Sequence, residues 1–132
     1  MSQRRVGLPP EDVIMSKVRT ILQGPVSDHE AFMTSVRKAL AFVEENEPDT
    51  LVYECFADEA SGRALWHEMF ADEDAWVTHI TNMNETGILP EMLEVLTPDQ
   101  VTVVTSSQDP RVLEIAEQFG ATKLHGVGGF VR

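Results

Sequence analysis

The stretch that decides the fold is TLVYECFADEASGRALWHEMFADEDAWVTHI, Thr50 to Ile80, which holds the only cysteine, the only tyrosine, both tryptophans and two of the four histidines. Residues 51–57 and 63–70 have the composition of strands, and the glycine-containing loop 58–62 has hairpin length. We therefore expect two antiparallel strands. Asp72 then begins a helix, because its carboxylate can accept hydrogen bonds from the first turn. The apolar stripe of that helix consists of Trp76, Ile80 and Met83.

The pairing of these two strands decides which side chains share a face. If Ala57 faces Arg63 across the loop, Tyr53 lies opposite His67. The face that these two share, with Leu51, Cys55, Leu65 and Met69, is expected to lie under the helices. The other face then carries Val52, Glu54, Phe56, Ala64, Trp66, Glu68 and Phe70. A slip of one residue in the pairing would exchange such sets between the faces.

The flanking segments complete an α+β pattern. Ser27 and Glu30 form a capping box that begins a helix, and Pro48 ends that helix. Residues 17–23 fit a strand, but residues 13–22 also fit one face of a helix, and the pattern leaves both open. Beyond the central stretch we expect a short helix at 90–96, a strand at 100–106, a helix that Asp109 and Pro110 begin and Gly120 ends, and a last strand at 122–127.

The order of these elements begins with the βαββαβ series of the ferredoxin-like fold, an antiparallel sheet of the α+β class. Residues 1–12 are expected to be a flexible tail, residues 13–132 a single domain, and residues 108–132 a C-terminal extension that adds a helix and a strand. The sheet face away from the helices would expose Val52, Phe56, Trp66 and Phe70. An apolar face of this size predicts a homodimer formed through the sheet.

Composition limits the partners of the chain. Ten Lys and Arg residues against 22 Asp and Glu give a net charge of -12, which argues against binding to nucleic acid or to anionic lipid. A single cysteine excludes an internal disulfide and favours a reducing cytoplasm. The apolar runs are too short to cross a membrane, and MSQRRVGLPPEDV at the N-terminus lacks the apolar core of a signal peptide.

Three segments, EPDTLVYE at 47–54, WHEMFADEDAW at 66–76 and THI at 78–80, resemble the antibiotic biosynthesis monooxygenase family over about residues 17–106. The resemblance implies a dimeric α+β barrel, in which each subunit has a ligand pocket between its own sheet and helices. It also implies that His79 faces this pocket and that residues 109–132 are an extension found in some members. Members of the family include cofactor-free oxygenases of quinols and polyketides, haem degraders and proteins with no assigned reaction.

These residues suggest a reaction that needs no cofactor. His79 can take a proton from a phenol or hydroquinone, and the resulting anion can react with O₂ directly, without metal or flavin. Tyr53 and His67 are the other candidate catalytic groups. The candidate substrate-binding side chains are Phe32, Val36, Leu65, Met69, Trp76 and Met83, with Leu51 beside them. A structural alternative is equally open, in which His79 bonds a neighbouring carbonyl and Tyr53 and His67 satisfy each other.

The other titratable residues receive structural interpretations. Glu54 and Glu68 are expected to form ion pairs, and Cys55 is expected to be a small buried hydrophobe. His67 and Glu68 resemble the start of the helical zinc motif, but the second histidine of that motif is absent. An iron site is also not expected, because Glu54 and His67 would point to opposite faces of the predicted sheet. The sequence thus predicts a cofactor-independent monooxygenase of a quinol-like or aromatic small molecule; the alternative is a non-catalytic small-molecule-binding or stress-related dimeric barrel.

Overall fold

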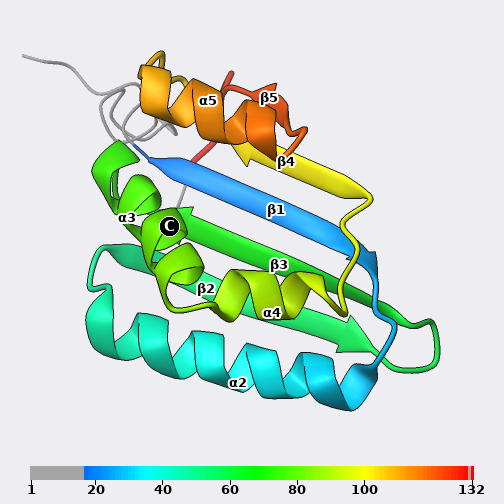
Figure 1. Ribbon diagram of the computed structural model, residues 1–132. Helices are drawn as coiled ribbons and strands as arrows, with labels where there is room; N and C mark the ends of the chain where they lie inside the picture. The colour runs from blue at the N-terminus through cyan, green and yellow to red at the C-terminus, as the bar shows by residue number, and fades with distance from the viewer. Residues whose placement is uncertain (1–16, 131) are drawn as a thin grey trace, which may run out of the picture.

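The computed structural model describes residues 17–130 and residue 132, so the predicted tail at 1–12 lies outside the described residues. A five-stranded sheet with the order β2-β3-β1-β4-β5 carries the described helices on one of its faces (Figure 1). The elements are β1 (Val18–Pro25), α2 (His29–Asn46), β2 (Thr50–Asp58), β3 (Arg63–Phe70), α3 (Glu73–Glu85), α4 (Ile88–Leu93), β4 (Gln100–Val104), α5 (Pro110–Gln118) and β5 (Thr122–Leu124).

The ferredoxin-like arrangement is confirmed. Strand β1 pairs antiparallel with both β3 and β4, and β3 pairs antiparallel with β2. The segment whose type the sequence left open is a strand, since β1 covers Val18–Pro25. The C-terminal extension contributes α5 and then β5, which adds to the edge of the sheet parallel to β4. Within the described part of the chain, no helix has the length and apolarity needed to span a membrane.

Aspartate side chains begin three of the helices. The Asp28 carboxylate accepts from the backbone N–H of Ala31, so Asp28, and not the predicted Ser27, is the N-cap of α2. The Ser27 hydroxyl instead donates to the Val95 carbonyl oxygen. The predicted caps Asp72 and Asp109 are confirmed for α3 and α5, where each carboxylate accepts a backbone hydrogen bond of the first turn.

The predicted register of the β2–β3 hairpin is wrong by one residue. Arg63 pairs with Asp58 and not with Ala57, so Tyr53 lies opposite Glu68 and not opposite His67. The loop is one residue shorter than expected because Asp58 accepts a hydrogen bond from the Ser61 amide and Gly62 adopts a positive φ of 68°. This shift exchanges the two faces of β3 relative to β2.

The exchange places the large aromatic side chains of β3 in the core. Trp66 and Phe70 are 2% and 0% exposed and lie under the helices, so neither belongs to an exposed sheet face as predicted. Trp66 packs with Phe32 and Val36 of α2, and Phe70 packs with Trp76 in a second cluster beneath α3 and α5. The face away from the helices carries Ile21, Val52, Phe56, Leu65 and Met69, with Arg19, Glu54 and His67 among them.

Replacement of Gly24 by a larger residue is expected to have a large effect on stability. It is buried in β1, and a Cβ atom added there would lie 2.0 Å from the backbone oxygen of Thr97. That backbone is held in place, since the Thr97 amide donates to the Pro25 oxygen. We expect Gly24→Ala to lower the free energy of unfolding by about 3 kcal/mol, measured by urea denaturation. Gly128→Ala is the control, since a Cβ there meets nothing within 4 Å; equal midpoints for the two variants would contradict the prediction.

Candidate functional site

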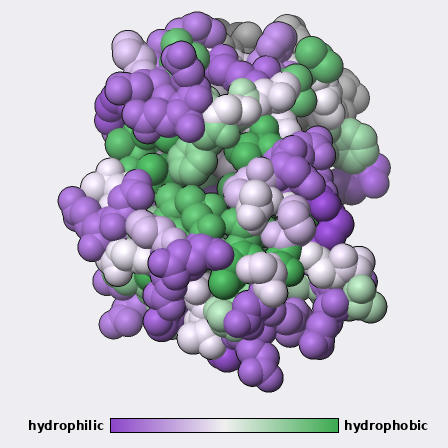
Figure 2. Space-filling view, turned by 45° about the vertical axis from the view of Figure 1, so that its right-hand side comes forward, coloured by the Kyte–Doolittle hydropathy of each residue, from purple (hydrophilic) through white to green (hydrophobic). Residues whose placement is uncertain are grey.

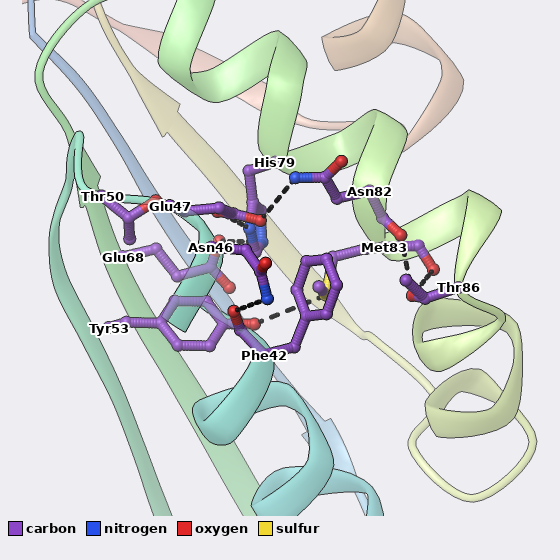
Figure 3. Close-up of polar contacts among 10 residues, drawn as sticks. All are labelled: Phe42, Asn46, Glu47, Thr50, Tyr53, Glu68, His79, Asn82, Met83 and Thr86. Carbon is purple, nitrogen blue, oxygen red and sulfur yellow. Dashed lines mark hydrogen bonds and ion pairs between the residues drawn. The ribbon is translucent and has the colours of Figure 1, made fainter. Parts of the chain in front are cut away.

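The centre of the site is a buried histidine held by a buried carboxylate. His79 lies on α3, and its Nδ1 is 2.8 Å from Oε1 of Glu47, which caps the C-terminus of α2 (Figure 3). Both side chains are only 3% exposed. Two further donors reach the same carboxylate: Thr50 Oγ1 at 2.9 Å from Oε1 and Asn82 Nδ2 at 3.1 Å from Oε2. The network therefore joins α2, β2 and α3.

These contacts favour the ionised form of Glu47. Burial by itself raises the pKa of Glu47, but the hydrogen bonds and charge of His79, with the bonds from Asn82 and Thr50, together hold the pKa below its usual value. Because an ionised carboxylate only accepts hydrogen bonds, we assign the proton of the bond to Nδ1 of His79. In the neutral form of the ring, the other nitrogen, Nε2, carries a lone pair. An imidazole oriented in this way is prepared to act as a base.

Nε2 of His79 faces Glu68 of β3 across 3.7 Å, a distance too long for a hydrogen bond. Burial raises the pKa of the Glu68 carboxyl, with a further rise from the charge of Glu47 and an opposing effect from His79. The two carboxyl groups near His79 therefore differ in character: Glu47 favours the anion and Glu68 favours the neutral acid. Environments that separate the pKa values of two neighbouring groups in this way are typical of acid–base sites.

Tyr53 supplies a third polar group. It lies directly opposite Glu68 in the hairpin, and its ring meets the His79 ring edge-on at 5.1 Å between centroids. Burial, together with the charges of Glu68 and Glu47, raises the pKa of the phenol, so Tyr53 stays protonated. Its hydroxyl donates to Met83 Sδ at 3.8 Å, and a thioether sulfur is a weak acceptor.

A mainly apolar cavity of about 50 Å³ reaches these groups. Its lining comes from β1, β2, β3, α3, α4, β4 and the end of α5: Thr20, Leu22, Tyr53, Trp66, Glu68, Trp76, His79, Ile80, Met83, Ile88, Leu89, Met92, Leu93, Leu96, Val101, Val103 and Phe119. Figure 2 shows apolar side chains gathered in a hollow with hydrophilic side chains around it. Cavities that hold an aromatic ring measure about 150 Å³, so a ring would have to displace lining side chains.

Two polar atoms of the lining have no hydrogen-bond partner within the described residues. They are Oγ1 of Thr20 and Nε1 of Trp76, each in a side chain that is more than nine-tenths buried. Thr20 pairs with Glu68 in the sheet, so Tyr53, Glu68 and Thr20 form a row across three strands under α3. Buried polar atoms are seldom left unpaired, and these two indicate a place for a polar atom of a ligand.

The structure brings together only some of the predicted site residues. His79, Tyr53, Trp76 and Met83 line the cavity. His67 does not join them, because the corrected register places it on the opposite sheet face, where its Nδ1 is 3.6 Å from Glu54.

The predicted substrate-binding side chains on the two strands and on α2 also lie outside the cavity. Leu65 and Met69 share the opposite sheet face with His67. Phe32 and Val36 are buried in the core between α2 and the sheet and do not line the cavity. More of the lining side chains come from α3 and α4 than from any strand.

Sequence reasoning missed the functional placement of Glu47 and Glu68. Glu68 was interpreted as an ion-pairing residue of the opposite face, a consequence of the register error. The sequence gives Glu47 no role of its own, because it stands only next to Pro48, which ends the predicted helix. One signal was available: Asn82 lies one helical turn after His79, so two polar residues share a helix side and need a common buried partner.

The remaining candidates give no nucleophile and no metal site. Burial raises the pKa of the Cys55 thiol to about 12, so the cysteine behaves as a small apolar side chain. Glu54 and His67 do share a face, contrary to the predicted parity, but His79 lies on the other side of the sheet. In the described ranges, no three His, Cys, Asp or Glu side chains are grouped so as to hold a metal ion.

Comparison with solved structures tests the fold. MupZ from Pseudomonas fluorescens superposes with a TM-score of 0.75 at 14% identity, over 89% of this chain and 95% of its own. A candidate antibiotic biosynthesis monooxygenase from Caulobacter crescentus CB15 gives 0.61 at 18% identity, over 73% and 94%. SnoaB, a cofactor-independent oxygenase from Streptomyces nogalater, gives 0.59 at 12% identity, over 72% and 97%.

The chain shares the fold of the antibiotic biosynthesis monooxygenases. No family model and no curated protein matches the sequence. At identities of 12–18% the likeness to the antibiotic biosynthesis monooxygenases establishes the fold alone. The fold predicted from the sequence is thereby confirmed, including the addition of a C-terminal strand to the ferredoxin-like sheet.

Proposed function

We propose that this chain is a cofactor-independent monooxygenase that acts on a quinol-like or aromatic small molecule with O₂. The observation that carries the proposal is the free Nε2 of His79 in an apolar cavity, with Nδ1 fixed 2.8 Å from Glu47. A base oriented by a buried carboxylate can remove the proton of a phenol. Apolar surroundings suit a neutral aromatic substrate and O₂.

The reaction balances without an external reductant. His79 takes a phenolic proton, and the anion passes one electron to O₂. The radical pair combines at a ring carbon to form a hydroperoxide, and loss of water from it leaves a carbonyl group. A hydroquinone and O₂ thus give a hydroxyquinone and water, with one oxygen atom in each product and all four electrons supplied by the substrate.

The first experiment follows O₂ uptake and quinone formation by the full chain with a panel of substituted hydroquinones under air. We expect one O₂ consumed per hydroxyquinone formed, and one ¹⁸O atom in the product when ¹⁸O₂ is supplied. Tight binding of a hydroquinone with no O₂ uptake above the buffer rate would overturn the oxygenase proposal. That result would favour the alternative, a small-molecule-binding barrel.

We further propose that two copies associate through the sheet face away from the helices. Phe56 of this face is 55% exposed, and Ile21, Leu65 and Met69 extend the apolar surface beside it. Arg19 and Glu54 lie on the same face, so a two-fold axis can bring opposite charges together. A second copy of the chain would satisfy both features.

Light scattering tests the dimer. We expect the wild type to have twice the 14.7 kDa mass of the chain, and Phe56→Glu to have the mass of a monomer, because the variant buries a charge in the proposed interface. Leu113→Glu on α5 is the matched control, since it adds the same charge at an exposed leucine outside that face. A monomeric wild type, or a dimeric Phe56→Glu variant, would contradict the proposal.

A further inference from the structure

The row formed by Tyr53, Glu68 and Thr20 lines the cavity, and the oxygenase proposal gives it no role. Tyr53 and Glu68 are cross-strand neighbours on the helix-covered face, and directly opposed side chains in a sheet lie about 5 Å apart at Cβ. Both line the cavity that contains His79. The Tyr53 hydroxyl and the Glu68 carboxyl group therefore stand side by side, close to the His79 ring, in apolar surroundings.

Neither the Tyr53 hydroxyl nor the Glu68 carboxyl group has a strong hydrogen-bond partner on the cavity side. The Tyr53 hydroxyl reaches only the Met83 sulfur at 3.8 Å, and Glu68 stays 3.7 Å from His79 Nε2 without a hydrogen bond. Oγ1 of Thr20, which has no hydrogen-bond partner among the described residues, lies next to Glu68 on the side away from Tyr53. An oxygen atom that develops negative charge in the gap would accept from such donors, which are already positioned before it arrives.

We propose that Tyr53 and Glu68 form an oxyanion-binding pair, with which His79 enolises an apolar carbonyl compound in this cavity without O₂. His79 Nε2 takes a proton from the carbon next to the carbonyl. The C–H electron pair becomes a C=C bond, and the carbonyl π electrons move to the oxygen, which accepts hydrogen bonds from the two residues. Return of the proton restores the substrate, so the step involves no net oxidation.

The small volume of the cavity limits how the substrate is held. About 50 Å³ admits the carbonyl group and the carbon beside it, whereas a ring system must lie toward the surface. Four of the partly exposed apolar side chains of the lining, Ile80, Leu89, Leu93 and Phe119, provide a contact for such a ring. The substrate class is therefore a cyclic or aryl ketone with one acidic C–H group next to its carbonyl.

The state of Glu68 gives a pH test, because only the neutral acid donates. The titratable groups that face Glu68 are His79 from α3, Glu47 at the end of α2, and Tyr53 and Cys55 from β2; Thr20 of β1 does not titrate. Exchange should fall as the pH rises and Glu68 ionises. Glu68→Gln keeps a neutral donor, so we expect this variant to lose the fall at high pH and keep most of the rate.

The experiment measures hydrogen–deuterium exchange of 2-tetralone in D₂O by NMR, without O₂. We expect catalysed exchange by the wild type, with losses of about 10²- to 10³-fold in Tyr53→Phe and in Glu68→Leu, the usual effect of removing one oxyanion donor. Glu44→Gln, on the exposed side of α2 and outside the cavity lining, is the control and should exchange like the wild type. The planar enol analogue 2-naphthol should bind about tenfold or more weakly to Tyr53→Phe and Glu68→Leu.

Three results would overturn the proposal. They are wild-type exchange no faster than buffer, Tyr53→Phe exchange equal to wild type, and a Glu68→Gln variant as inactive as Glu68→Leu. The inference shares the cavity and the base His79 with the oxygenase proposal, but not the reaction with O₂. Anaerobic exchange with no aerobic O₂ uptake, or the reverse, would separate the failure of one from the failure of the other.

Discussion

His79→Ala is expected to lower the rate of O₂ uptake with a hydroquinone by about 10²- to 10⁴-fold, the usual contribution of a positioned general base. The variant loses the only imidazole that lines the cavity and leaves the Glu47 carboxylate without its closest donor. The measurement is the initial O₂ uptake rate at saturating substrate, between pH 5 and pH 9.

Two other histidines provide controls for this result. His29→Ala removes a surface histidine near Glu59 and should leave the rate unchanged. His67→Ala discriminates between the sequence prediction and the structure, because His67 lies beside Glu54 on the other face of the sheet. A loss of rate in His67→Ala as large as that in His79→Ala would contradict the placement of the site.

Glu47→Ala is expected to lower the free energy of unfolding by about 3–5 kcal/mol, the cost of removing one partner of a buried pair. The substitution leaves three donors without their acceptor: Nδ1 of His79, the Thr50 hydroxyl and the Asn82 amide. Both members of the central pair are 3% exposed, so solvent does not weaken the interaction. Urea denaturation followed by circular dichroism measures the change, and Glu44→Ala on the exposed side of α2 is the control.

The effect of Glu47→Ala also has a defined pH dependence. The folded pKa of Glu47 lies below its ordinary value of 4.5, so the folded protein binds fewer protons at this site than the unfolded chain. Its contribution to stability is therefore complete above pH 4.5 and is lost as the pH falls through the folded pKa. The difference between wild type and variant should shrink below that pH; an equal difference at pH 3 and pH 7 would contradict the ionic role of Glu47.

Local signals predicted the elements of this fold with few errors. The alternation of 17–23 fits β1, Asp72 and Asp109 begin α3 and α5, and positive-φ glycines follow the ends of these helices. Such features depend on contacts among neighbouring residues in the chain, and the sequence displays them directly. The N-cap of α2 was misplaced by one residue, because Ser27 and Asp28 are both good caps and only the bond of Ser27 to Val95 separates them.

The candidate site was predicted less well, because it depends on strand register. A loop shortened by one residue places Glu68 and not His67 beside Tyr53, and so replaces a second imidazole by a carboxyl group whose pKa burial raises. The turn is stabilised by Asp58 and Ser61 and by the bond from the Val26 amide to the Gly62 oxygen, which involves a segment 36 residues earlier in the chain. Sequence periodicity contains no information on this last contact.

The sequence by itself determined the class of the fold, the order of the elements that follow the first and the place of His79 on α3, since each follows from short-range periodicity and capping. Only the tertiary structure decided which groups surround that histidine. Glu47 comes from the turn after α2, Glu68 from a central strand and Tyr53 from its neighbour. Their convergence depends on the packing of α3 against the sheet and on a one-residue choice of register, and both are settled by long-range contacts that no local pattern records.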